Sequence, residues 1–163
     1  MNAPFKILAA AVCGLLLGLP AAQAEIPVYV FIDMGAPGNA MTMSPREVTL
    51  KAGEIYRFVV SNPGEMTHVV AAPELAATVQ TKQLTIGSPR LELYEGRVDW
   101  GQAARTALPA RKIIAGVTLQ PGSQIEWTFT PLVEGVYKFG CDEPAHAAAG
   151  MFAMVDVISQ DVH

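Results

Sequence analysis

The chain has 163 residues, 51% of them hydrophobic, and a formal net charge of −4 at pH 7. This length supports one domain with a core of ordinary size. The mild acidity and the lack of any basic run exclude a protein that binds nucleic acid. After residue 24 no apolar segment approaches the about 20 residues that a membrane span needs.

Residues 1–24 have the layout of a secretory signal peptide. Lys6 precedes an apolar run from Ile7 to Leu19, and the small-residue sequence Ala22-Gln23-Ala24 follows. These thirteen apolar residues are too few for a membrane anchor. We therefore expect cleavage after Ala24, export to the periplasm and a single mature domain at residues 25–163.

Cleavage would leave one cysteine in the mature chain. Removing 24 of 163 residues leaves 139, and the loss of Lys6 without any acid changes the formal charge from −4 to −5. A lipoprotein anchor at Cys13 is a weaker alternative, because Val12 precedes it where a small residue is expected. In an oxidising compartment the remaining Cys141 is a free thiol, an intermolecular bridge or a metal ligand.

Several short segments alternate apolar and polar residues and are separated by Gly and Pro turns, which is typical of half-buried strands. In one of them Ile125, Trp127 and Phe129 share a face, and Thr128 is expected to face water together with Arg57 of another segment. The pattern predicts an all-β sandwich of about seven or eight strands. The expected strands cover residues 26–32, 47–51, 54–60, 67–71, 111–119, 124–130, 135–141 and 151–157.

Residues 72–110 alternate poorly and are long for a connection inside a compact domain. We interpret this interval as an insertion before the final strands. Short helical turns are plausible around Pro73–Val79 and Trp100–Arg105.

The segment 140–157 places a cysteine, a histidine and a methionine at intervals of five residues. Alternation around Lys138 and Asp156, which should face solvent, predicts that Cys141 and Met151 point inward. His146 then lies in the loop between the two strands. A thiolate, a thioether and an imidazole can converge on one point there.

This set of side chains suits a metal. Two histidines, one cysteine and a weak axial methionine form the signature of mononuclear electron-transfer copper, whereas structural zinc prefers closed sets of cysteine and histidine. The second histidine is either His68, at the head of a strand after a Pro-Gly turn, or His163. His163 is the terminal residue and is expected to be disordered.

A histidine at a strand end, followed far downstream by Y-x-F-x-C-x₄-H-x₄-M and a short final strand, resembles the cupredoxins, with a loop spacing most similar to that of rusticyanin. The resemblance implies a Greek-key β-sandwich with one copper ion per chain. It also implies His68, Cys141 and His146 as equatorial ligands and Met151 as the axial one. Val69 differs from the family pattern, in which a polar residue usually follows the first histidine and braces the ligand loops.

As a cupredoxin, the protein is expected to be a periplasmic one-electron carrier between transient redox partners such as a cytochrome. No Ser-His-Asp set, H-E-x-x-H motif or phosphate loop is present, so we do not expect an enzyme.

The alternative is a copper-binding module for buffering, delivery or tolerance. The cluster Met34, Met41 and Met43 could then hold Cu(I) weakly, although packing on the sandwich is the simpler interpretation. The oligomeric state is left open.

Overall fold

The computed structural model describes residues 25–87, 91–94, 97–100, 106–107 and 116–160. The expectations for the signal peptide, Cys13, His163 and residues 101–105 and 111–115 lie outside this part of the chain. Within the described part, no helix is both long enough and apolar enough to cross a membrane.

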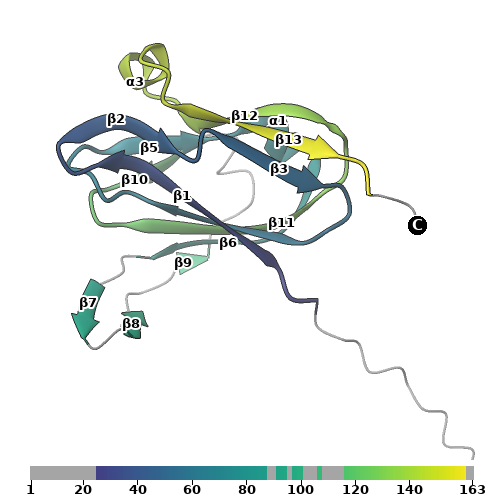
Figure 1. Ribbon diagram of the computed structural model, residues 1–163, viewed down its shortest axis with the longest axis horizontal. Helices are drawn as coiled ribbons and strands as arrows, with labels where there is room; N and C mark the ends of the chain where they lie inside the picture. Colours follow the sequence, from purple (N-terminus) through teal and green to yellow (C-terminus); the bar gives the residue numbers. More distant parts are fainter. Residues whose placement is uncertain (1–24, 88–90, 95–96, 101–105, 108–115, 161–163) are drawn as a thin grey trace, which may run out of the picture.

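Two sheets pack face to face and form a β-sandwich (Figure 1). The first sheet has the strand order β2-β1-β4-β11-β6-β9. Its strands are β1 (Val28–Ala36), β2 (Asn39–Ser44), β4 (Tyr56–Ser61), β6 (Val79–Gly87), β9 (Thr106–Ala107) and β11 (Gln124–Pro131). The second sheet has the order β10-β5-β12-β13-β3. It contains β3 (Glu47–Lys51), β5 (His68–Ala71), β10 (Val117–Leu119), β12 (Gly135–Cys141) and β13 (Phe152–Ile158).

The remaining described elements are small. A two-stranded ribbon of β7 (Leu91–Tyr94) and β8 (Arg97–Trp100) lies below the first sheet in Figure 1. The helices are α1 (Pro73–Ala77) and α3 (Pro144–Ala148). Both helices begin with proline, which suits the first turn because its missing N–H has no partner there in any case.

The chain repeatedly crosses between the two sheets. β1 pairs in parallel with β4, and β13 pairs in parallel with β3, while most other pairs are antiparallel. Parallel neighbours need such crossovers, because a short hairpin can join only antiparallel strands. This arrangement confirms the predicted β-sandwich.

Aromatic side chains join the two sheets near the middle of the core. The ring centroid of Phe58, on β4, lies 4.9 Å from that of Phe129 and 5.5 Å from that of Phe139, in edge-to-face geometry. Trp127 is fully buried in the same group. Because Phe139 belongs to the second sheet, this cluster holds the sheets together two residues before Cys141. Burying one such side chain contributes about 1.5–3 kcal/mol.

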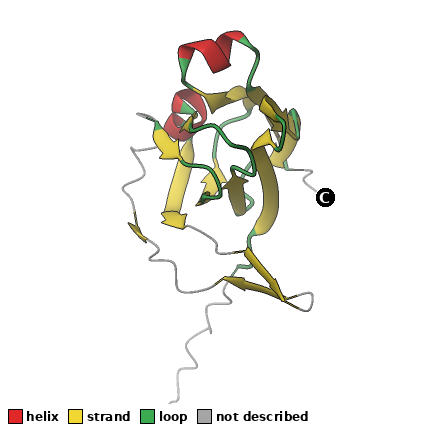
Figure 2. Cartoon of the chain, turned by 90° about the vertical axis from the view of Figure 1, so that its left-hand side faces the viewer, coloured by secondary structure: helices red, strands yellow, loops and turns green. Residues whose placement is uncertain are grey.

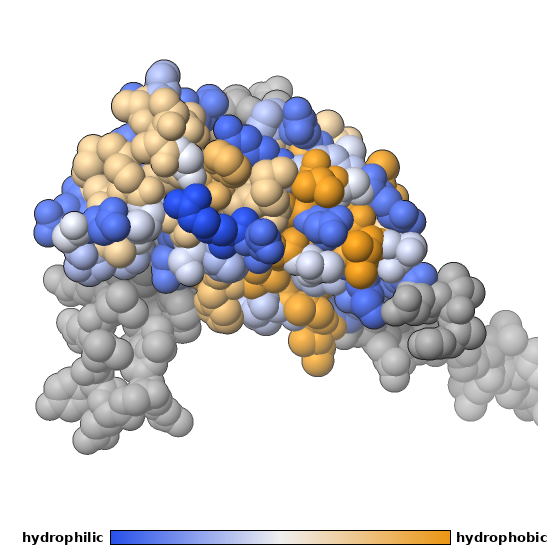
Figure 3. Space-filling view, turned by 45° about the horizontal axis from the view of Figure 1, so that its top comes forward, coloured by the Kyte–Doolittle hydropathy of each residue, from blue (hydrophilic) through white to orange (hydrophobic). Residues whose placement is uncertain are grey.

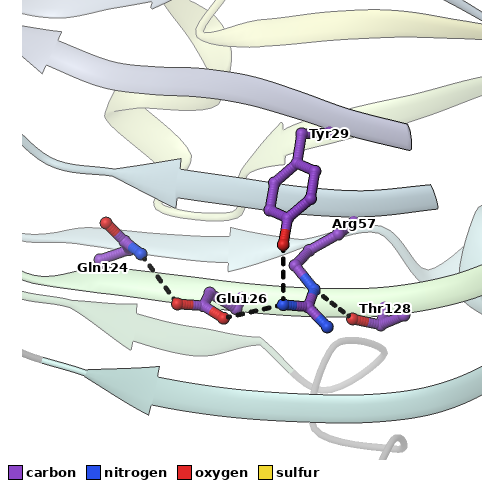
Figure 4. A network of polar contacts seen from close by, with 5 residues as sticks. All are labelled: Tyr29, Arg57, Gln124, Glu126 and Thr128. Carbon is purple, nitrogen blue, oxygen red and sulfur yellow. Dashed lines mark hydrogen bonds and ion pairs between the residues drawn. The ribbon is translucent and has the colours of Figure 1, made fainter. Parts of the chain in front are cut away.

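The prediction that Thr128 faces water is wrong, because a long side chain covers it. Thr128 does lie on the outer face of the first sheet, but Nε of Arg57 donates a hydrogen bond of 3.0 Å to its hydroxyl (Figure 4). The same guanidinium donates to the Tyr29 hydroxyl over 3.2 Å and lies 3.9 Å from Glu126. Gln124 extends this network through Glu126. Threonine is short, so the flexible arginine stem shields it from solvent.

The interval 72–110 is only partly an insertion. The helical turn expected around Pro73–Val79 is present as α1, but β6 follows at once and pairs with β11 along its whole length. A register shift opposite Thr128 and Phe129 gives β6 one extra residue, which interrupts its alternation and hides the strand in the sequence. In the described part of the chain the two sheets contain six and five strands, more in total than the seven or eight expected for the sandwich.

Two of the three clustered methionines belong to the core. Met34 on β1 and Met43 on β2 lie opposite each other in the register and are buried, whereas Met41 is partly buried. Buried thioethers on paired strands favour the packing interpretation over a mobile Cu(I)-binding loop.

Candidate metal centre

The four predicted ligands lie on one side of the sandwich. His68 is the first residue of β5, and Cys141 is the last residue of β12. His146 lies on α3, and Met151 directly precedes β13. In Figures 1 and 2, α3 stands above the strands and closes this end of the molecule. Ligands at element ends are held by the rigid sheet without interrupting its hydrogen bonds.

Three donor atoms converge in a dry space. Nδ1 of His68 lies 3.2 Å from Nδ1 of His146, and this same atom of His146 lies 3.4 Å from Sγ of Cys141. One donor atom from each of the three residues lies within 4.8 Å of the others. The side chains of His68, His146 and Cys141 are 0%, 4% and 3% exposed, respectively. A single ion between them would therefore be shielded from water.

Backbone hydrogen bonds take the place of the polar brace that Val69 lacks. The Val69 N–H points at Sγ of Cys141 over 3.4 Å, and the Val69 carbonyl accepts a 2.8 Å bond from the N–H of Asp142. These bonds tie the strand of the first histidine to that of the cysteine, and a donor aimed at sulfur stabilises the thiolate. A backbone contact of this kind does not depend on side-chain type, so the sequence held no signal for it.

The loop from Cys141 to Met151 is closed by its own backbone. The Cys141 N–H donates to the Met151 carbonyl over 3.0 Å, and the Met151 N–H donates to the His146 carbonyl over 3.1 Å. Gly140 makes this close approach possible, because a Cβ there would lie 2.6 Å from the Met151 carbonyl oxygen. No local pattern in the sequence signals this role of Gly140, which only the strand pairing reveals.

The electrostatics of the site favour a neutral, metal-binding imidazole at His68. Burial lowers the pKa of His68, and the neighbouring His146 lowers it further. A neutral ring carries a proton on one nitrogen and a lone pair on the other, and the two Nδ1 atoms lie within hydrogen-bond distance at 3.2 Å, so one ring donates its N–H to the other. A cation between these nitrogens and the Cys141 sulfur would take the place of that shared proton. The donor set therefore fits a soft transition-metal ion such as copper.

The structure agrees with the predicted inward facing of Cys141 and Met151. His68, Cys141 and His146 meet, as the sequence predicts for three of the four ligands. Met151 is fully buried at the root of the same loop. The roles of His68, Cys141 and His146 as equatorial ligands and of Met151 as the axial one stay predictions, and His163 lies outside the described residues.

The fold and the buried group of one cysteine and two histidines define a class of protein, namely a β-sandwich whose side chains can hold copper. The chain belongs to the plastocyanin/azurin family of copper-binding proteins, whose family model matches residues 30–158. This range includes all four predicted ligands. Membership in the cupredoxins and copper as the cofactor are thereby confirmed, whereas the likeness of the loop to that of rusticyanin stays a prediction.

Known proteins similar to this chain include one from Pseudomonas aeruginosa, the copper-resistant cuproprotein CopI. It is 26% identical over 157 residues, which cover 88% of this chain and 83% of the relative. A multicopper oxidase from Campylobacter jejuni superimposes with a TM-score of 0.53 at 15% identity, covering 86% of this chain but 32% of the oxidase. Auracyanin B gives a TM-score of 0.47 at 17% identity over 83% of this chain and 93% of auracyanin B. At such identities the structural likeness concerns the fold alone.

Proposed function

We propose that this protein is an exported, periplasmic type 1 copper protein that carries one electron at a time between redox partners. The observation that supports this most strongly is the burial of a converging donor set on a rigid frame. His68, Cys141 and His146 are held by three separate elements, and each is at most 4% exposed. A carrier benefits from ligands that do not rearrange or exchange, and this arrangement restricts both.

Each of the four residues would have its own role at the copper site. Cys141 would bind as a thiolate, which the Val69 N–H stabilises. His68 and His146 would bind copper through Nδ1, and Met151 would supply a weakly binding thioether. Copper held in this way supplies a reversible one-electron couple. The strands and the closed loop resist a change of ligand positions between the two oxidation states, which lowers the rearrangement that each transfer requires.

Electrons would enter and leave near His146. This residue lies on α3, where Ala145, Ala147 and Ala148 surround it. Figure 3 shows a weakly apolar surface at this end of the molecule. Small apolar side chains let a partner approach a buried ligand closely, and transient redox encounters use small interfaces.

The acidic balance of the chain suggests partners, such as a cytochrome, with basic docking faces. Association between opposite charges is faster at low salt, because salt screens the attraction. The rate of electron exchange with a basic cytochrome should therefore fall as ionic strength rises. An exchange rate that does not respond to salt would contradict this part of the proposal.

We do not propose an enzymatic activity. The two described histidines face each other at the metal centre, which leaves neither for proton transfer to a substrate. The oxidase with a similar fold is about three times as long as the aligned region, since this region covers 32% of it.

Copper tolerance is the second candidate function. It is favoured by the similarity to the copper-resistant cuproprotein of P. aeruginosa, which extends over most of both chains. A handling protein would release its copper to an acceptor, whereas a carrier would retain copper through many redox cycles. The burial of Met34 and Met43 argues against a methionine-based exchange site at that cluster.

The first experiment is a titration of the purified protein with Cu(II), followed by visible spectroscopy and electrochemistry. We expect an intense thiolate-to-copper charge-transfer band, one copper per chain and reversible bleaching on reduction. Cys141→Ala should abolish the band, and His163→Ala should leave it intact. A colourless protein, or equal copper uptake without Cys141, would contradict the proposal. Ready transfer of copper to a competing chelator would favour handling instead.

A further inference from the structure

Asn62 is a buried polar residue that the ligand set does not use. It directly follows β4, in the sequence Asn62-Pro63-Gly64, and its side chain is 1% exposed. A buried amide loses its hydrogen bonds to water, so it is tolerated only where protein partners replace them. The position of those partners shows which part of the molecule the amide holds in place.

All three hydrogen bonds of its side chain end on backbone around the first histidine. Nδ2 of Asn62 donates to the carbonyl of Met66 over 2.7 Å and to the carbonyl of Leu119 over 3.1 Å. Oδ1 accepts a 3.0 Å bond from the N–H of Gly64. One amide thus ties together the end of β4, the turn that follows it and β10.

These partners lie directly beside His68. Met66 precedes His68 by two residues, and Leu119 is opposite His68 in the antiparallel pairing of β10 with β5. The Asn62 amide therefore fixes both the chain that leads into His68 and the strand paired with it. The main chain of Asn62 adds two bonds to the turn between β10 and β11, from its N–H to Ser123 and from Gly122 to its carbonyl.

The space behind the His68 ring is closed by the same group of residues. A Cβ at Gly35, which has a φ of +87°, would lie 3.0 Å from Nε2 of His68 and 3.3 Å from Oδ1 of Asn62. A Cβ at Gly64 would also lie 3.3 Å from this Oδ1. Nε2 itself is buried and has no hydrogen-bond partner in the described part of the chain. On this side the ring is therefore placed by packing and by its backbone, because no hydrogen bond to Nε2 orients it, and its only described polar contact is that of Nδ1 with His146.

We propose that Asn62 is a positioning residue that sets the place of the His68 ring and thereby tunes the copper site. The inference rests on the proposed role of His68 as a copper ligand. Contacts behind a ligand orient it and alter the affinity and the electronic properties of the metal. Here the Asn62 side chain acts through the backbone of Met66, which leads into His68, and of Leu119, which is paired with it.

An amide is required at this position by its chemistry. Two donors must meet two carbonyl oxygens while one acceptor meets an N–H, and asparagine offers this set on a short side chain. Aspartate has the same size, but its carboxylate would place an acceptor against the carbonyls of Met66 and Leu119. Serine is smaller and cannot bridge the three groups.

The test compares Asn62→Asp and Asn62→Ser with Tyr56→Phe. Tyr56 lies at the opposite end of the same strand and is also a buried residue with hydrogen bonds, so its variant controls for a general loss of stability. We expect the Asn62 variants to bind Cu(II) about 10–100-fold more weakly, with a shifted charge-transfer band and reduction potential. Tyr56→Phe should leave the affinity, the band and the potential unchanged.

A second readout uses the metal-free protein. The NMR signals of the His68 ring should move in the Asn62 variants and stay in place in Tyr56→Phe. If His68→Ala keeps the copper affinity of the wild type, the proposed ligand role fails, and the metal-free spectra still decide whether Asn62 positions the ring. Wild-type spectra, potential and affinity in both Asn62 variants would overturn the inference. Failure of both to fold would also overturn it, since Asn62 would then be needed for the whole domain.

Discussion

Nδ1 of His68 and Nδ1 of His146 lie 3.2 Å apart, although the two residues are separated by 78 positions in the chain. The first belongs to the strand β5 and the second to the helix α3, so only the folded sandwich brings them together. The centre is thus a product of packing between strands, and a change in that packing should be detected at the metal.

Gly140→Ala should destabilise the metal-free protein by about 1–3 kcal/mol, because a Cβ would collide with the Met151 carbonyl oxygen at 2.6 Å and force the backbone apart. Urea unfolding of the metal-free protein measures this change. Gly38→Ala is the control, since a Cβ there meets nothing within 4 Å and tests only the cost of a positive φ. Equal stability of Gly140→Ala and the wild type would show that the Cys141–Met151 loop can shift to accommodate the Cβ without a loss of unfolding free energy.

Copper should raise the free energy of unfolding through the buried ligands. At a free copper concentration about 100 times the Kd, the gain is about 2.7 kcal/mol. His68→Ala should lose most of this gain, whereas His163→Ala should retain it. Thermal unfolding with and without copper measures the difference for each variant. A full gain in His68→Ala would remove this residue from the ligand set.

Met151→Leu tests the axial ligand. Leucine is of similar size, so the buried position stays filled while the thioether is removed. We expect the variant to keep its copper and to show a higher reduction potential, because the lost donor stabilises Cu(II) more than Cu(I). Voltammetry of both proteins in one buffer checks this. An unchanged potential and spectrum would place the sulfur outside the coordination sphere.

Phe58→Ala should lower the free energy of unfolding by about 3–5 kcal/mol. The substitution removes a fully buried ring that contacts aromatic rings of both sheets and leaves a cavity. Phe31 offers a matched control. It is 64% exposed and stacks only on Tyr29 among the described rings, so Phe31→Ala should change stability by about 0.5 kcal/mol or less. Chemical denaturation of the two variants measures both losses of unfolding free energy. Similar losses would refute the assignment of Phe58 to the core.

Stability at alkaline pH should depend on Tyr56. Burial raises the pKa of Tyr56 above its ordinary value of 10.0, and the nearby Glu54 carboxylate raises it too, against a lowering by the Lys51 N–H. The phenol then stays protonated in the folded state while the unfolded state ionises. Its contribution is therefore complete below pH 10 and is lost as the pH rises through the folded pKa.

Tyr56→Phe should consequently lose less stability than the wild type does as the pH rises above 10. Urea unfolding at several pH values, from neutral to above 10, provides the measurement. Parallel pH profiles for the two proteins would mean that another group is responsible for the alkaline dependence.

Local features of the fold and the site were predictable from the sequence. Alternation of apolar and polar residues marked strands such as β11 and β12 and predicted that Cys141 and Met151 point inward. The spacing C-x₄-H-x₄-M, together with a second histidine at a strand end, indicated copper. Both signals are local, since strand periodicity and loop length depend only on neighbouring residues.

Long-range contacts decided the rest. β6 was hidden because an extra residue breaks its alternation, and only its pairing with β11 reveals it as a strand of the sandwich. The brace at Val69 is a backbone N–H, which every residue except proline possesses, so no side chain signals it. The convergence of His68 with His146 depends on the pairing of β5 with β12 in the second sheet, next to the loop that carries α3. By itself the sequence determined a loop spacing and a set of residue types that suit copper, and the tertiary structure decided where their donor atoms meet, because distances between remote segments are set by packing.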